Sequence, residues 1–192
     1  MAVSNRPLNL DEADRIYYDA YKALQEAREK SKDLEWAGTV RAAQLCIELS
    51  VKGILRLFDI EYPPEHDVSD RLVVIPKKVK GLPDHLVESI ARTRVCSKVW
   101  EPTHALAVYG GLDTSPSRLF KETDAKAATE CASDANSCLT TLLNLAKLAN
   151  WNFKELKANW RPNKRIAGKT QQDSSSATMR GHQSLSRRFH TN

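Results

Sequence analysis

The sequence predicts an all-α protein, an antiparallel up-and-down bundle of four long helices plus a short helix. Four long stretches carry apolar residues at three- and four-residue steps, which is the spacing of an amphipathic helix. Residues 1–160 contain no alternation of apolar and polar residues long enough to indicate a strand. Long helices joined by short or moderate loops are typical of an antiparallel bundle.

The first two helices are expected over Asn9–Ser31 and Leu34–Phe58. In the first, acidic residues gather at the start and basic residues at the end, an order that suits the helix dipole. The second has so broad an apolar face that we expect it to be the most buried helix. Within it, Glu48 lies four residues before Lys52, the favourable order for an intrahelical ion pair.

A turn and a short helix follow. Pro63 and Pro64 remove backbone donors and end the helical pattern. Asp67 is expected to cap a short helix that runs to Val74 and stops at Pro76. The basic stretch after Pro76, residues 77–81, is expected to be a loop.

The remaining long helices are expected from Pro83 to Val99 and from Thr123 onward. Pro102 is expected to kink or interrupt the helix that begins at Pro83. Gly110 is expected to supply the left-handed backbone that ends a helix. Residues 113–117 are expected to be a polar loop. Small residues dominate the stripe of the last helix and predict a close approach to its neighbours: Ala125, Ala128, Ala132, Ala135, Leu139, Leu142, Ala146 and Ala149.

The net charge of +5 is concentrated at the C-terminal end of the chain. Residues 161–192 carry a net +6, which leaves residues 1–160 with a net −1. We therefore expect a helical domain over residues 1–160 and a disordered basic tail over residues 161–192. The tail is expected either to bind nucleic acid phosphates or only to aid solubility. Its basic residues are Arg161, Lys164, Arg165, Lys169, Arg180, Arg187 and Arg188.

Several protein classes are disfavoured. The longest aliphatic runs are four residues, as at Leu72–Ile75, far short of the roughly 18 to 20 needed to cross a bilayer. The first residues lack the apolar region of a secretory signal, so a cytoplasmic location is expected. The four cysteines show no zinc-finger or disulfide spacing. No metal and no cofactor are expected.

A succession of short motifs resembles the HEPN domain, a helical domain shared by higher eukaryotes and prokaryotes. The motifs occur in order over roughly residues 9–150: Glu48-Leu49-Ser50-Val51-Lys52-Gly53-Ile54-Leu55, Ile60-Glu61-Tyr62-Pro63, His66-Asp67-Val68, Trp100-Glu101-Pro102, Tyr109-Gly110, Leu119-Phe120 and Asp124-Ala125. The resemblance implies an up-and-down bundle that is usually a homodimer. It also implies frequent association with a small nucleotidyltransferase and with toxin–antitoxin or defence systems.

Many members of this family are metal-independent ribonucleases, with an Arg followed on the same helix by a His about one and a half to two turns later. This sequence lacks that spacing. Its nearest candidates are Arg94 and His104, with nine residues between them. On one straight helix these two would differ by about 15 Å of rise and about 80° in direction. A kink at Pro102 or a partner chain could bring the two side chains together. The alternatives are that Arg94 is a surface charge and that His104 is a hydrogen-bonded histidine beside Trp100.

Four further residues are candidates for nucleotide or ligand binding. Glu48 and Lys52 could line a pocket, or could simply form an ion pair beside the core. His66 and Asp67 match the family's loop motif, or could act locally, with Asp67 capping a helix and His66 bonding nearby backbone.

Two functions therefore remain. The first is a HEPN-like dimerisation and binding module, nucleotide- or RNA-associated and partnering a nucleotidyltransferase-like protein. The second is a metal-independent HEPN ribonuclease that uses Arg94 and His104. A homodimer is expected because the alanine stripe of the last helix and the broad face of the second offer more packing surface than one bundle consumes.

Overall fold

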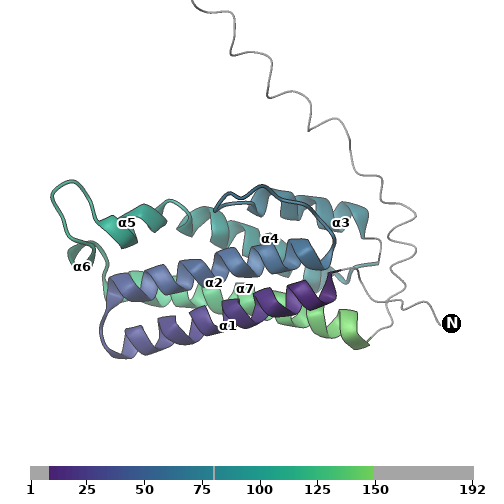
Figure 1. The fold of residues 1–192 in the computed structure, drawn as a ribbon, viewed down its shortest axis with the longest axis horizontal. Coiled ribbons are helices and arrows are strands. Elements are labelled where there is room, and N and C mark those ends of the chain that lie inside the picture. The colour runs from purple at the N-terminus through teal and green to yellow at the C-terminus, as the bar shows by residue number, and fades with distance from the viewer. Residues whose placement is uncertain (1–8, 80, 149–192) are drawn as a thin grey trace, which may run out of the picture. The chain divides into compact units, whose positions relative to one another are not determined.

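The computed structural model describes residues 9–79 and 81–148, and this part of the chain is all-α (Figure 1). The four long helices are α1 (Leu10–Lys32), α2 (Trp36–Leu57), α4 (Asp84–Trp100) and α7 (Glu122–Leu148). The short elements between them are the 3-10 helix η1 (Ser69–Val74), α3 (Ile75–Lys78), α5 (Thr103–Tyr109) and α6 (Pro116–Leu119). The predicted fold class is confirmed.

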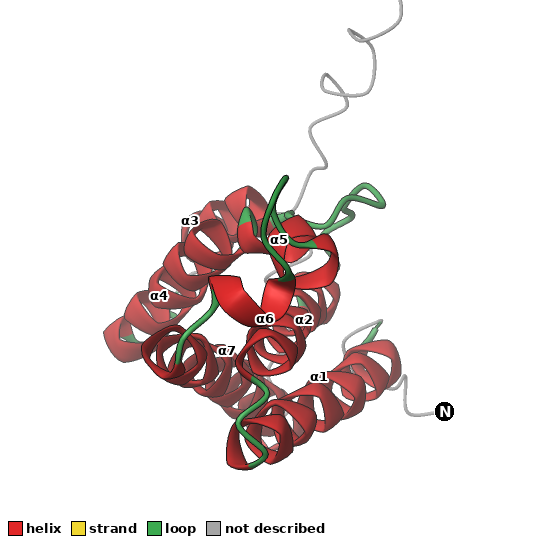
Figure 2. Cartoon of the chain, turned by 90° about the vertical axis from the view of Figure 1, so that its left-hand side faces the viewer, coloured by secondary structure: helices red, strands yellow, loops and turns green. Residues whose placement is uncertain are grey.

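The four long helices run up and down along one axis (Figure 1). α2 and α7 each contact all three other long helices, so these two form the centre of the bundle. Polar contacts hold the start of α1 to the ends of the central helices. Asn9 donates a hydrogen bond to Asp59 at 3.0 Å, and the Lys147 ammonium lies 2.7 Å from the Asp14 carboxylate. The end-on view shows α5 and α6 at the opposite end, where α7 begins (Figure 2).

The core of the bundle is closely packed along α7. Ala125, Ala128, Ala132 and Ala135 have no exposed surface and pack in one apolar cluster with α1 and α2. The predicted close approach of the last helix is therefore confirmed. However, every member of this stripe that the structure describes, from Ala125 to Ala146, is buried in the chain's own core, so this part of the stripe offers no surface to a second chain. That reason for expecting a dimer was wrong.

Two of the predicted connections are helical instead. Pro76 does not stop the short helix, because α3 begins at Ile75 and places Pro76 in its first turn, where no backbone donor is needed. Lys77 and Lys78 are therefore helical rather than part of a loop. In the same way, Pro116 opens α6 inside the predicted polar loop.

Pro102 does interrupt the helix, because α4 ends at Trp100 and α5 begins at Thr103. The predicted basic tail, with its candidate nucleic-acid-binding residues, lies outside the described residues. None of the helices in the described ranges has the length and apolar character needed to span a membrane.

The backbone conformation that ends α5 requires glycine at position 110. Its φ of 81° and ψ of −172° lie in a region that only glycine adopts readily, and an added Cβ would lie 2.4 Å from the Thr114 carbonyl oxygen. Gly110→Ala is expected to lower the free energy of unfolding by about 1–3 kcal/mol in urea titrations. Gly111→Ala is the matched control, because its Cβ would meet open space. Equal losses in the two variants would contradict this account.

Candidate functional site

A band of polar and charged side chains crosses α2, α4, α5, the first turn of η1 and the segment that precedes η1. We call this band the polar site. Its members are Gln44, Glu48, Lys52, His66, Asp67, Asp70, Arg94, Ser97, Lys98 and His104. The segment that follows α2 folds back onto this helix, since His66 contacts Glu48 well before the helix ends. This return brings residues 66–70 against α4 and α5.

One half of the polar site is centred on Glu48. The predicted ion pair is confirmed: the Lys52 ammonium lies 2.6 Å from one Glu48 carboxylate oxygen. The other carboxylate oxygen lies 3.3 Å from Nδ1 of His66. Only 11% of the Glu48 side chain and 19% of the Lys52 side chain are exposed, so water screens this pair weakly.

His66 and His104 stack on one another, with ring centroids 4.8 Å apart. The acceptors beside them fix which ring nitrogen carries the proton. Nδ1 of His104 lies 2.7 Å from Oε1 of the buried Gln44, and Nδ1 of His66 faces the Glu48 carboxylate. Because both oxygens can only accept, both histidines donate from Nδ1. In the neutral form, each ring therefore keeps a lone pair on Nε2.

The other half of the polar site is centred on Asp67. Its carboxylate accepts hydrogen bonds from the Ser69 backbone N–H at 3.0 Å, the Ser97 hydroxyl at 3.1 Å and the Lys98 ammonium at 2.6 Å. Only 12% of this side chain is exposed. The prediction that Asp67 caps the short helix was wrong, because the N-cap of η1 is Val68 and has no side-chain cap hydrogen bond. Asp67 instead closes a local turn onto the Ser69 backbone N–H, and its contacts with Ser97 and Lys98 tie the start of η1 to α4.

Asp70 extends the charge network outward. Its carboxylate lies 2.8 Å from Lys98 and accepts two hydrogen bonds from the Arg94 guanidinium, at 2.8 and 3.2 Å. The pKa of Asp70 is lowered by its hydrogen bonds with Lys98 and Arg94. The pKa of Lys98 is raised by its hydrogen bonds with Asp67 and Asp70. Two carboxylates therefore balance two cations on this side of the site.

Burial alone would raise the pKa of Asp67, but its hydrogen bonds outweigh burial. The bonds from Lys98, Ser69 and Ser97 lower the pKa from 3.8 to about 2. Asp67 is therefore an ionised structural anion at neutral pH. Among the described residues, no group of three or more His, Cys, Asp and Glu side chains is arranged to hold a metal ion.

Comparison with known proteins identifies the family of this chain. The sequence pattern of the HEPN domain family matches residues 13–145, more than half of the chain. The chain belongs to the HEPN domain family. Its HEPN bundle is similar to the crystal structure of TT1696 from Thermus thermophilus, with 22% sequence identity and a TM-score of 0.50 over 68% of this chain and 97% of that chain.

A second crystal structure, that of ST0689, an archaeal HEPN homologue, is 21% identical to this chain. The match covers 72% of this chain and 97% of that chain, with a TM-score of 0.41. No curated protein matches the sequence.

The HEPN bundle brings most of the predicted site residues into contact. Glu48, Lys52, His66 and His104 form one connected set, and Arg94 joins Asp67 through Lys98 and Asp70. Arg94 and His104 lie on different helices, α4 and α5, and each has its own partner. The expectation that His66 would bond nearby backbone was wrong, because its partner is the Glu48 carboxylate.

Sequence reasoning missed Gln44, Asp70, Ser97 and Lys98 as members of the site. Lys98 lies one turn after Arg94, which would have placed both cations on one face of the helix. Asp70 is separated from Arg94 by 24 positions, so no local spacing indicates their contact. Gln44 could not be predicted as a member of the site, because its partner, His104, lies 60 residues away in the sequence.

The site gives a pH-dependent prediction for Asp67. Because its folded pKa is below its ordinary value, its stabilising effect is complete above about pH 4 and is lost as the pH falls toward about 2. Asp67→Asn is expected to lower the free energy of unfolding by about 2 kcal/mol at pH 7. This difference from wild type should shrink as the pH falls through that range.

Asp70→Asn serves as the control in the same denaturant series, since 64% of the Asp70 side chain is exposed. Its effect should be clearly smaller. A loss from Asp67→Asn that stays constant between pH 7 and pH 2 would refute the assignment of Asp67 as the stabilising anion.

Proposed function

We propose that this HEPN protein is a dimerisation and binding module, associated with a nucleotide or RNA, that acts beside a nucleotidyltransferase-like partner. Arg94 and His104 each bind a different neighbouring residue, and this observation supports a binding role rather than RNA cleavage. Asp70 binds the Arg94 guanidinium, and Gln44 binds the His104 ring. A phosphate that needed both groups would first have to displace Asp70 from Arg94.

The charge balance of the polar site supports the same proposal. Asp67 and Asp70 face Arg94 and Lys98, and Glu48 faces Lys52. A site that carries as many carboxylates as cations does not concentrate a polyanion such as RNA. In this proposal, RNA affinity comes instead from the basic tail, and the polar site shapes a protein interface.

The support for a dimer comes from α4 rather than from α7. Val95 and Val99 are 58% and 57% exposed and lie one turn apart, on the helix that carries Arg94 and Lys98. Leu106 on α5 is 42% exposed. Apolar side chains beside a polar rim are typical of a protein–protein interface.

Light scattering on the purified chain is expected to give about twice the 21.6 kDa of one chain. Substituting both valines, Val95→Asp with Val99→Asp, should shift the mass to that of a monomer, because two charges would be buried in the interface. Tyr18→Asp is the control, since Tyr18 is 57% exposed on α1. A wild-type monomer at micromolar concentration would refute the dimer, and an unchanged mass in the double variant would refute this interface.

The second candidate function is a metal-independent ribonuclease, which the stacked histidines specifically favour. RNA cleavage needs a base for the 2′-hydroxyl, an acid for the leaving oxygen and a cation on the phosphate. His66 and His104 could supply the first two from their Nε2 atoms, and Arg94 the third after release from Asp70.

A labelled-RNA assay distinguishes the two functions. We expect no cleavage by the purified wild-type chain above that of a mock purification, because the cations are held by carboxylates. His104→Ala and Arg94→Ala are the decisive variants. His85→Ala is the control, since His85 is exposed in the first turn of α4. Cleavage that disappears in the decisive variants and persists in the control would establish the ribonuclease instead.

A further inference from the structure

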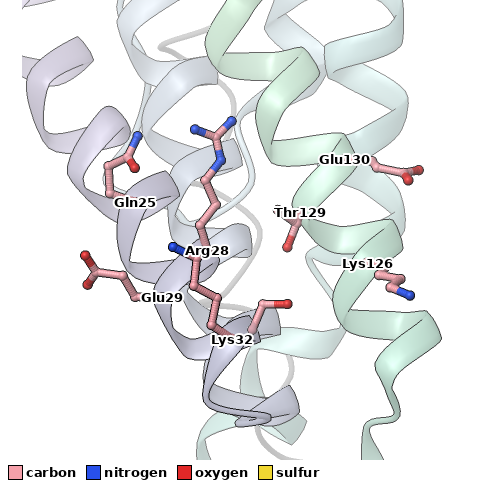
Figure 3. Close-up of a pocket in the computed structure, with 8 residues that line it drawn as sticks. Gln25, Arg28, Glu29, Lys32, Lys126, Thr129 and Glu130 are labelled. Atoms are coloured by element: carbon pink, nitrogen blue, oxygen red, sulfur yellow. The ribbon is translucent and has the colours of Figure 1, made fainter.

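A pocket of about 400 Å³ lies between the last turns of α1 and the first half of α7 (Figure 3). It contains none of the residues of the polar site. α1 contributes Gln25, Arg28, Glu29, Ser31 and Lys32, and α7 contributes Lys126, Thr129 and Glu130.

Two cations of α1 line this pocket. Arg28 and Lys32 lie four residues apart on one face of the helix, and both line the pocket (Figure 3). Neither side chain has a hydrogen bond or ion pair with any other residue in the described ranges 9–79 and 81–148. By contrast, Glu29 points away from α7, and Glu130 extends along the outer side of its own helix (Figure 3).

Both cations therefore stand without a compensating anion among the described residues. Like charges four residues apart destabilise a helix by a few tenths of a kcal/mol. Lys126 differs from them, because its ammonium lies 2.6 Å from Glu122. An anion in the pocket would relieve the repulsion between Arg28 and Lys32 and would gain charge-assisted hydrogen bonds from both.

The residues that line the pocket adjoin the apolar core in the sequence. Ala27 and Ala128, which precede Arg28 and Thr129 in the sequence, are fully buried in one apolar cluster. The buried thiol of Cys46 on α2 is close enough to respond to Arg28. Burial raises the pKa of this thiol to about 12, and the Arg28 charge acts against that rise. Arg28 and Lys32 are themselves exposed, so they meet an anion at the protein surface.

The donors fit a phosphate group. The Arg28 guanidinium offers a planar fork for two oxygens, and the Lys32 ammonium offers a second positive charge for a dianion. Ser31 and Gln25 add neutral donors. Thr129 can only accept, since its hydroxyl already donates to the Ala125 carbonyl at 2.8 Å. We propose that the pocket between α1 and α7 binds a small phosphate-bearing ligand through Arg28 and Lys32.

The test uses inorganic phosphate and the full chain, observed by backbone amide NMR. Phosphate should shift the amides around residues 25–32 and 126–130 with saturation. Arg28→Gln should weaken this binding about tenfold or more, because a charged hydrogen-bond pair is removed. Lys32→Gln should weaken it several-fold. Arg41→Gln, which removes an exposed arginine from α2, is the matched control and should leave the affinity unchanged.

A thermal unfolding series provides a second measurement. Phosphate should raise the Tm of wild type and of Arg41→Gln, and should not raise that of Arg28→Gln. Succinate distinguishes phosphate from carboxylate, and equal affinity for succinate would overturn the assignment to phosphate. Shifts that spread over the surface without saturation, or that persist in Arg28→Gln, would show adventitious ion binding only and would overturn the site itself.

Discussion

The close approach of α7 to its neighbours is the constraint on which the bundle depends. Four alanines on this helix have no exposed surface, and Cys46 of α2 is near enough to donate to the Ala132 carbonyl at 3.6 Å. A larger side chain at Ala132 would push α2 away. The polar site depends on that distance, because α2 carries Gln44 and Glu48 while α4 carries Arg94 and Lys98, and both helices pack on α7.

Sequence periodicity was sufficient to predict the four long helices because each buries one continuous stripe. It was less informative about short segments. Pro76 and Pro116 were expected to end or exclude helix, yet each stands in the first turn of a short one. The same residue type is compatible with both outcomes. At Pro76, the burial of Ile75 favours the helical outcome, whereas α6 has no buried residue that would explain the helix at Pro116.

The candidate site was predictable where its contacts are local and unpredictable where they are not. The Glu48–Lys52 pair follows from a four-residue spacing, and the local contact of Asp67 follows from its place just before η1, although Val68 and not Asp67 is the N-cap. The His66–His104 stack joins residues that are far apart in sequence, and nothing local to either histidine indicates the other. The resemblance to the HEPN family drew attention to both histidines, but only the fold shows that they share one contact.

The contact between Asp14 and Lys147 has a consequence for the order in which the chain assembles. These residues are 133 positions apart, so the two outer ends of the bundle meet only when nearly all of its sequence is present. α1 and α2 are consecutive and can pair early, whereas both apolar clusters are completed by α7. During synthesis on the ribosome, the alanine-contacting faces of α1 and α2 therefore stay in water until the last long helix has emerged.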